Sequence, residues 1–462
     1  MHTLLVIVSF SVLAAMAARN GAFWLRMWRQ PAVLKRERAE VRAAAAASDP
    51  ATRRARDAIQ LHYVIPAFQE VESLEKTFLA LRQSIEASSY HATITVVTSV
   101  HEPHGPGVVS THTVAQALCD RFADATCLMD RSDVPSMAAA FNTGMRDVAR
   151  RGSGDAERTY VVVYNGDSTA APDSVQALGD TLVARSCPAA AQINFLSLRN
   201  VDEITGPGRW YTVGAAYYQT RWAFGFEYDL HRRNSAAHRQ GPLGHSYHLK
   251  GHGLALRLDT ALDVGGFSTQ TPCEDLELGF RLALRRVPVH VVPVLEDTEH
   301  PTTAAAVTAQ KRYWYSGMVD VLQFHWLLPE YRAAQPLRFE LSRLASIYRS
   351  AGCFLLGPVP YWFLVAAAVV LGQPALAVLP FLNAALSAYL IRRAAGKLGR
   401  PLPPLRPAEY VLLPVGILLW SLTRNIGPVQ YLWSMVRSSD RQGRLRATHL
   451  RHLDDDTEKR PV

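Results

Sequence analysis

Apolar residues are concentrated toward the two ends of this chain of 462 residues, and this uneven distribution restricts the folds open to it. Residues 3–18 form one apolar run and residues 350–436 contain several more, whereas residues 50–340 mix short apolar segments with charged ones. A chain of this length exceeds one ordinary hydrophobic core, so a large domain and a further part are expected. The distribution predicts a water-facing domain with membrane-spanning helices at both ends.

The first apolar run is followed by basic residues and has none before it. Residues 1–18 contain no Lys or Arg, and six follow soon after: Arg19, Arg26, Arg29, Lys35, Arg36 and Arg38. Because positive residues beside a span stay on its cytoplasmic side, we predict an uncleaved anchor that leaves the next domain in the cytoplasm. A cleaved signal peptide is the alternative, because Ala15-Met16-Ala17 resembles a cleavage site.

Two apolar segments near the C-terminus, residues 353–371 and 374–391, have about the length needed to cross a bilayer core of about 30 Å. A Gly-Gln-Pro link joins them and Arg392-Arg393 follows, so they are predicted to form a helical hairpin that returns to the cytoplasmic side. Residues 410–422 are shorter and contain proline. They are therefore either a third C-terminal span or a re-entrant segment.

Charge and cysteine content exclude several classes of protein. The net charge of +9 is carried largely by Arg residues beside the apolar segments, and residues 337–350 and 425–437 have the composition of interfacial helices. This pattern predicts contact with anionic lipid, and no nucleic-acid partner is expected. The five cysteines are scattered and form no Cys-x-x-Cys pair, which argues against a disulfide framework or a zinc site.

The middle of the chain alternates segments typical of strands and helices. Strands are predicted at residues 61–68, 93–99, 160–164 and 192–198, and helices at 71–87, 114–122, 138–149 and 174–185. This alternation predicts an α/β fold with a mostly parallel sheet covered on both faces. Ligands bind at the carboxyl ends of such strands, where Pro66–Glu70 and Asn165–Ser168 lie.

These patterns divide the chain into five predicted parts. They are an N-terminal transmembrane anchor (1–30), a basic and Ala-rich linker (31–58), a cytoplasmic domain (59–335), interfacial and transmembrane helices (336–440), and a charged tail (441–462). A Rossmann-type oxidoreductase is disfavoured, because the segment after the first predicted strand lacks the Gly-x-Gly-x-x-Gly approach to a pyrophosphate.

A set of short motifs in a fixed order gives residues 61–320 a family resemblance. The motifs are Ile65–Glu70, Asn142–Gly144, Asn165–Asp167, Gly251–Gly253, Gly265–Phe267, Glu274-Asp275, Glu299–Thr302, and Gln310 with Trp314. In this order they resemble the family 2 glycosyltransferases, which have a GT-A fold that binds nucleotide-sugars. The resemblance is strongest to the membrane-embedded branch that includes the cellulose, chitin and hyaluronan synthases.

The resemblance implies a donor site and a metal. Asp167 stands where the family's metal-binding Asp-x-Asp motif ends, which predicts Mg²⁺ or Mn²⁺ held against the departing nucleoside diphosphate. Asn165 replaces the first Asp of that motif, and Pro66, Glu70 and Asn142 complete the predicted donor site. A purely structural role in a turn is the alternative for Asp167, since Asn, Gly, Asp and Ser are all residues that favour turns.

Glu274 and Asp275 precede an apolar helical pattern and are the predicted catalytic pair, with Asp275 as general base. Favourable placement at a helix N-terminus is the alternative explanation for both acids. The family's usual Thr before the pair is Cys273 here. The second predicted strand lacks the Asp that relatives place against the base, so Thr98 or Glu102 are candidate substitutes.

The acceptor and diphosphate site is predicted at Gly251, His252, Gln310, Arg312, Tyr313 and Trp314. The last four resemble the family's Gln-x-x-Arg-Trp motif, in which Trp stacks on the acceptor sugar. Tyr313 occupies the Arg position and Arg312 lies one residue early, which on a helix rotates the guanidinium by about 100°. Aromatic residues at a membrane interface are the alternative explanation for this stretch.

Together these features predict an inverting glycosyltransferase of the inner (plasma) membrane. Its donor would be a nucleotide-sugar, of the UDP class by resemblance, and its acceptor a membrane-associated glycan or lipid in cell-surface polysaccharide synthesis. Addition of one sugar to a lipid carrier or glycolipid is the first alternative. A non-catalytic membrane binding module that keeps the fold is the second.

Overall fold

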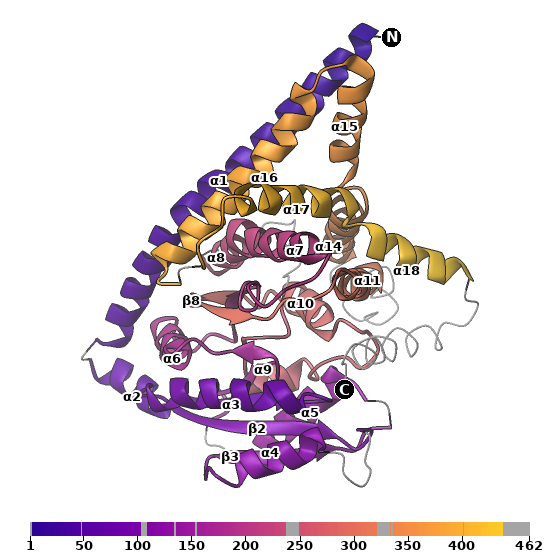
Figure 1. Ribbon diagram of the computed structural model, residues 1–462. Helices are drawn as coiled ribbons and strands as arrows, with labels where there is room; N and C mark the ends of the chain where they lie inside the picture. Colours follow the sequence, from indigo (N-terminus) through magenta and orange to yellow (C-terminus); the bar gives the residue numbers. More distant parts are fainter. Residues whose placement is uncertain are drawn as a thin grey trace.

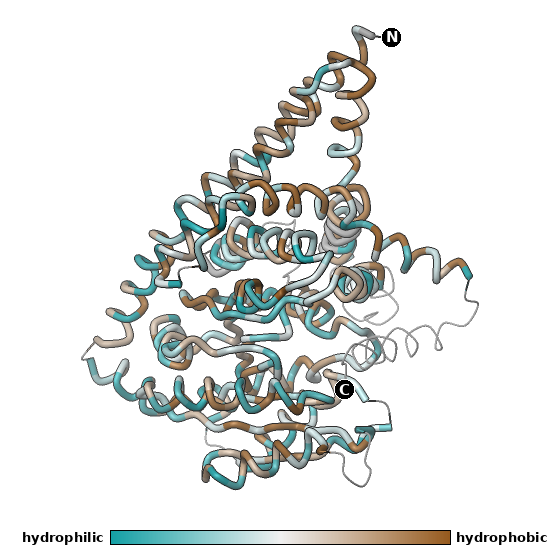
Figure 2. The backbone as a smooth tube through the Cα atoms, viewed as in Figure 1, coloured by the Kyte–Doolittle hydropathy of each residue, from teal (hydrophilic) through white to brown (hydrophobic). Residues whose placement is uncertain are grey.

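The computed structural model describes residues 2–47, 49–102, 109–133, 135–152, 155–236, 249–320, 333, 336–400 and 402–437. A bundle of long helices rises from a domain built on one sheet, and the N-terminus lies at the far tip of the bundle (Figure 1). Hydrophobic residues gather on α15 and α17, whereas hydrophilic residues are frequent over the sheet domain (Figure 2).

The sheet has eight strands in the order β3-β2-β1-β4-β7-β6-β8-β5. Neighbours among β1 to β4 run parallel, as do β6 and β8, whereas β7 and β5 are antiparallel to their neighbours. The predicted α/β fold with a mostly parallel sheet is confirmed. The strands are β1 Gln60–Pro66, β2 His91–Ser99, β3 Ala125–Asp130, β4 Thr159–Val163, β5 Ser168–Thr169, β6 Ala190–Leu196, β7 Leu254–Arg257 and β8 Val289–Thr298.

Both faces of the sheet are buried, which follows from the apolar residues at successive strand positions. On β1, Leu61, Tyr63 and Ile65 join one hydrophobic cluster and Val64 joins the other, as the two-residue period of a strand requires. The first cluster includes α3 (Val71–Glu86), α4 (Thr111–Cys119) and α6 (Ser174–Ala184). The second includes α5 (Met137–Arg150), α9 (Leu258–Asp263) and α10 (Glu274–Leu284).

The bundle consists of α1 (His2–Ala45), α15 (Val359–Leu371) and α16 (Ala375–Lys397) (Figure 1). The last two form the expected helical hairpin. Gly372 ends α15 with a φ of 61°, a conformation that favours glycine, and Pro374 precedes α16. Within the segment expected to be a linker, residues 31–45 form the last third of α1, and Pro50–Ala58 form the short helix α2.

Helix α17 (Glu409–Thr423) lies across the base of this bundle (Figure 1). It packs on α7 (Arg209–Trp222) with close backbone contact: a Cβ on Gly416 would lie 1.9 Å from the carbonyl oxygen of Trp210. A Cβ on Gly214 would lie 2.3 Å from the Gly416 carbonyl carbon. Small residues allow such an approach of two helices. Helix α17 contains residues 410–422, for which a third C-terminal span and a re-entrant segment were the alternatives, and it runs between the bundle and the sheet domain (Figure 1).

The structure describes several further helices. They are α8 (Tyr228–Ala236), α11 (Ala304–Asp320), α14 (Pro336–Arg349), α18 (Ile426–Arg437), and π-helical turns at Ala223–Glu227 and Ser350–Leu355. Within the described residues, four segments are long and apolar enough to cross a membrane: Thr3–Ala45, Gly352–Leu371, Ala375–Lys397 and Glu409–Arg437.

Candidate active site

Several loops that carry the predicted site residues meet at one edge of the sheet. Strands β1 and β4 run parallel, so their carboxyl ends, at Pro66 and Val163, lie at the same edge. Strand β7 is antiparallel to β4, and Leu254 pairs with Val163. The segment Gly251–Gly253, which precedes β7, therefore reaches the edge where β4 ends, and the Gly253 N–H donates to the Val163 carbonyl at 2.8 Å.

Asp167 lies in the turn between β4 and β5. The Thr77 hydroxyl oxygen holds this turn, because it lies 2.7 Å from both the Gly166 and the Ser168 carbonyl oxygens. The Asp167 side chain reaches solvent, yet the surrounding protein desolvates its carboxyl and raises its pKa, and His252 acts in the opposite direction. Ser168 pairs with Thr298, the residue before Glu299. Burial raises the pKa of Glu299, Arg199 at 3.5 Å opposes this shift, and the Asp167 charge adds to it.

Glu70 stands directly against the Asp167 turn. A Cβ on Gly166 would lie 1.7 Å from Glu70 Oε2, so only glycine leaves room for this carboxylate. The preceding Gln69 has a φ of 55°, and its N–H donates to Glu102 Oε1 at 2.9 Å. Pro66 ends β1 at the start of this loop. The structure thus brings Pro66, Glu70 and Asp167 together.

His252 is buried beneath the same turn. Its Nε2 donates to Glu296 Oε2 at 2.5 Å, and its Nδ1 accepts a hydrogen bond from the Asn165 N–H at 3.5 Å. Both side chains of the His252–Glu296 pair are almost fully buried. His252 therefore positions the Asn165–Asp167 turn from below. It has no exposed edge with which to contact an acceptor in this arrangement.

The predicted catalytic pair begins α10 and lies beside Gly251. The Gly251 N–H donates to Asp275 Oδ2 at 2.8 Å, and the Leu276 N–H donates to Oδ1 at 2.6 Å. A Cβ on Gly251 would also lie 3.8 Å from Glu274 Oε1. Asp275 is half-buried and Glu274 is buried. Burial, reinforced by the charge of Asp275, raises the pKa of Glu274 to about 8.

Helix α11 brings Tyr313, from the Gln310–Trp314 stretch, beside this pair. The Tyr313 hydroxyl donates to the Pro272 carbonyl, and a Cβ on Gly317 would lie 2.3 Å from the Cβ of Cys273. The charges of Glu274 and Asp275 act on Tyr313, whose pKa is raised chiefly by burial. The residue at the family's Arg position thus lies next to the carboxylates.

The other residues of α11 face elsewhere. The backbone of Arg312 lies on the side that packs against Gly427 of α18. The buried Lys311 ammonium lies 3.6 Å from the centre of the Trp314 ring and donates to Gln219 Oε1 at 2.9 Å. Burial lowers the pKa of Lys311 to about 7. Gln310 is half-buried on the same helix.

Three residues that were predicted to bind the donor instead form hydrogen bonds within the protein. Both polar atoms of Asn142 pair with the Phe267 backbone, at 2.8 Å each. Thr98 hydrogen-bonds His112 Nδ1 at 2.9 Å, and Glu102 accepts from the Gln69 and His112 backbone N–H groups. In this structure their side chains support loops at the sheet edge.

A divalent metal at Asp167 would rest on few protein ligands. Among the described residues, no group of three or more His, Cys, Asp or Glu side chains is arranged to hold a metal ion. Mg²⁺ usually binds through one or two carboxylates together with substrate phosphates and waters, so such a group is not required. The exposed Asp167 carboxylate, with Glu299 nearby, fits that sparse donor set.

Two acidic residues of the site region were not predicted from the sequence. Glu296 is buried in β8 against His252, and a carboxylate directly after the apolar run Val291–Leu295 is the signal that marks it. Asp130 ends β3 and accepts hydrogen bonds from Thr143 Oγ1 at 3.0 Å and Ser132 Oγ at 2.6 Å. Its strand was not among those expected.

Comparison with known proteins gives one family match. Residues 160–389 match the model described as Glycosyl transferase family group 2. A search of curated proteins found no match.

Several solved structures are similar over most of their length. The mannosyltransferase PcManGT from Pyrobaculum calidifontis, in complex with GDP-Man and Mn²⁺, has 16% identity and a TM-score of 0.43, with 90% of this chain and 98% of that chain covered. TarS 1-349 from S. aureus has 11% identity and a TM-score of 0.36, with 80% and 92% covered. Its complex with UDP-GlcNAc has 11% identity, a TM-score of 0.35 and the same coverage. At TM-scores below 0.5 these similarities decide nothing about donor or metal.

The matched region coincides with most of the site. It contains the Asp167 turn, His252, the Glu274-Asp275 pair and the Gln310–Trp314 stretch, and it continues through α15 into α16. Residues 160–389 of this chain are therefore similar to the glycosyl transferase family group 2 model over most of the candidate site.

Proposed function

We propose that this protein is a membrane-bound inverting glycosyltransferase that moves a sugar from a nucleotide-sugar to an acceptor at the membrane surface. The observation that supports it best is the hydrogen bond from the Gly251 N–H to Asp275. Through Gly251 and His252, this bond links the paired acids of α10 to the Asp167 turn. This arrangement places Asp275, the proposed proton acceptor, and Asp167, the proposed donor-binding carboxylate, at the same edge of the sheet.

In this proposal the two acids of α10 differ in protonation state. Burial and repulsion favour the protonated form of Glu274 near neutral pH, which leaves Asp275 as the ionised member. Asp275 is then able to take the proton of the acceptor hydroxyl as that oxygen bonds to the anomeric carbon. The bond from this carbon to the diphosphate breaks in the same step, and the diphosphate leaves with the electron pair.

Asp167 would hold the divalent ion, Mg²⁺ or Mn²⁺, at the strand-end turn, whereas the nearby Glu299 is paired with Arg199 at 3.5 Å. When bound, such an ion neutralises negative charge on the departing diphosphate. Burial raises the pKa of the Asp167 carboxyl, and a bound cation would stabilise its ionised form. Glu70 and Thr77 keep the turn in place.

The acceptor is best explained as a membrane lipid or lipid-linked glycan. In the described bundle, Leu364, Ala367 and Leu376 are buried against partly buried apolar residues that include Val12 and Leu13. This apolar packing favours a lipid acceptor over passage of a growing polymer between the helices. Polysaccharide assembly with polymer extrusion is the alternative. The Arg residues at the base of the bundle support an inner-membrane location with the sheet domain in the cytoplasm.

The experiment is a donor screen on the purified full-length protein in detergent with membrane lipid extract. UDP-, GDP- and dTDP-sugars are supplied with Mg²⁺ or Mn²⁺, nucleoside diphosphate release is measured, and products are weighed by mass spectrometry. We expect release with one donor class and a lipid product heavier by one sugar. A ladder of masses would identify a polymerase. Nucleotide binding without release from any donor would instead support the non-catalytic binding module.

A further inference from the structure

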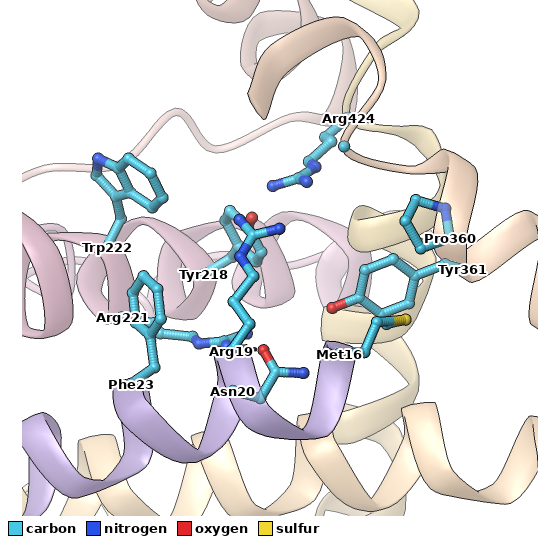
Figure 3. Close-up of a pocket in the computed structure, with 11 residues that line it drawn as sticks. Met16, Arg19, Asn20, Phe23, Tyr218, Arg221, Trp222, Pro360, Tyr361 and Arg424 are labelled. Carbon is cyan, nitrogen blue, oxygen red and sulfur yellow. Dashed lines mark hydrogen bonds between the residues drawn. The ribbon is translucent and has the colours of Figure 1, made fainter. Parts of the chain in front are cut away.

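A second polar site lies where α1, α7, α15 and the end of α17 meet (Figure 3). It is a small, partly open cavity with about 30 Å³ of accessible space. Three arginines contribute to its lining: Arg19 from α1, Arg221 from α7 and Arg424 from the end of α17. Figure 3 shows Arg19 and Arg424 extending toward one another, with Asn20 and Tyr361 beside them. Among the described residues that line the cavity, none is acidic.

Two of the arginines are buried. Only 7% of Arg221 and 9% of Arg424 is exposed, and the Nε of each is buried without a hydrogen-bond partner among the described residues. Arg221 Nη2 donates to Asn20 Oδ1 at 2.6 Å, and the Arg424 guanidinium lies 4.9 Å from the centre of the Tyr218 ring. Tyr361 also contacts Arg221, and within the described part of the chain no acidic side chain acts on either guanidinium. Buried charges of one sign are costly unless an opposite charge joins them.

The cavity lies at the boundary between the apolar bundle and the sheet domain. Arg19 directly follows the apolar run at residues 3–18, and Met16 lines the cavity while also packing against the apolar cluster of the bundle. On the other side, α7 belongs to the sheet domain through its packing on α11 and β6. Near this level, the exposed Trp362 donates through its indole N–H to the Leu422 carbonyl at 2.8 Å. Trp residues are enriched at the depth of lipid head groups.

We propose that this cavity binds the phosphate group of a membrane lipid. The guanidinium group matches the geometry of phosphate oxygens, and basic pockets between membrane helices on the cytoplasmic side accept lipid head groups. A phosphate is the anion that a bilayer supplies at this depth. It comes either from an anionic phospholipid or from a phosphorylated polyprenyl carrier. The site shares no residue with the carboxylate site, so the inference holds whether or not the protein transfers sugar.

The test measures lipid retention by native mass spectrometry of the full-length protein in detergent, without donor. The added lipids are dioleoylphosphatidylglycerol, a polyprenyl monophosphate and dioleoylglycerol, which has the same chains as the first but no phosphate. We expect the two phosphate lipids to bind and dioleoylglycerol to bind at least about tenfold more weakly. Preference for the polyprenyl monophosphate identifies a carrier site, and equal binding or preference for phosphatidylglycerol identifies a site for bulk anionic lipid.

Three variants assign the binding to the cavity. Arg221→Gln and Arg424→Gln should each weaken phosphate-lipid retention about tenfold. Arg19→Gln changes an exposed side chain, so it keeps the test valid where a buried variant fails to fold. Arg437→Gln is the matched control, because Arg437 is exposed at the end of α18, outside the cavity. Equal retention by wild type and the folded cavity variants, or equal retention of dioleoylglycerol, would overturn the proposal.

Discussion

The protein contains two polar sites of opposite charge, and they deal with buried charge in different ways. At the sheet edge, Glu274 is buried beside Asp275, and its pKa rises to about 8 so that a proton removes the charge. The arginines of the cavity have no such option, because a guanidinium stays charged in proteins. The acidic site is therefore stable without a ligand. The basic site depends on an external anion or on water.

Among variants that distinguish the acidic site from the basic site, Asp275→Asn should have the largest effect. This change should lower sugar transfer by about 10²- to 10⁴-fold, because the acceptor proton loses its base, while nucleoside diphosphate affinity stays nearly the same. Diphosphate release and calorimetric binding measure the two quantities. Asp263→Asn is the control, since that side chain is 75% exposed on α9. If transfer survives in Asp275→Asn, the base lies elsewhere.

The second test separates the two sites by metal. Asp167→Ala should weaken nucleoside diphosphate binding at least about tenfold in the presence of Mn²⁺ and abolish its dependence on that ion. EDTA should have the same effect on the wild type, yet leave phosphate-lipid retention unchanged, because the cavity is lined by cations. Loss of lipid retention in EDTA would show that both ligands use one metal-dependent site.

The third test disturbs the basic site alone. In Gly416→Ala the new Cβ would overlap the Trp210 carbonyl, so α17 must move away from α7. We expect a loss of about 1–3 kcal/mol in the free energy of unfolding and weaker phosphate-lipid retention, with nucleotide binding preserved. Gly21→Ala is the control, since no atom lies within 4 Å of its Cβ. Thermal unfolding and native mass spectrometry report the two effects, and equal behaviour of both variants would contradict this account.

The smallest expected effect concerns the proton on Glu274. Between about pH 4.5 and pH 8 the folded protein keeps a proton that the unfolded chain releases, so its stability should fall as the pH rises through this window. Glu274→Gln cannot lose a proton, and its melting temperature should therefore fall less, by on the order of a few degrees. Scanning calorimetry from pH 5 to pH 9 compares the two proteins. Parallel curves would mean that Glu274 is ionised throughout.

Much of the sheet domain was predictable because its signals are local. The helix expected at residues 71–87 is α3 (Val71–Glu86), and the strand ends at Pro66 and Val163 lie where apolar β-branched runs stop. Strand β3 was missed because Ala125–Asp130 is only partly buried and contains a single β-branched residue.

The contacts that complete the site were not predictable, because they join residues far apart in the chain. The His252–Glu296 pair depends on the placement of β7 and β8 in one sheet, and sequence spacing does not contain that placement. The direction of α17 depends on the meeting of Gly214 and Gly416, which lie on separate helices. Composition showed that residues 410–422 are apolar, but it did not show which surface they cover.

Helix α1 has a consequence for the choice of acceptor. Its 44 residues span about 66 Å at 1.5 Å per residue, roughly twice the thickness of a bilayer core. The half beyond the bundle is fastened to the sheet domain, where Glu37 accepts a hydrogen bond from the Tyr228 hydroxyl at 2.9 Å and Arg38 pairs with Asp173. In the proposed membrane arrangement, this one helix would set the height of Asp275 above the bilayer. An acceptor hydroxyl at another height would then be excluded by distance, without any contact to a side chain.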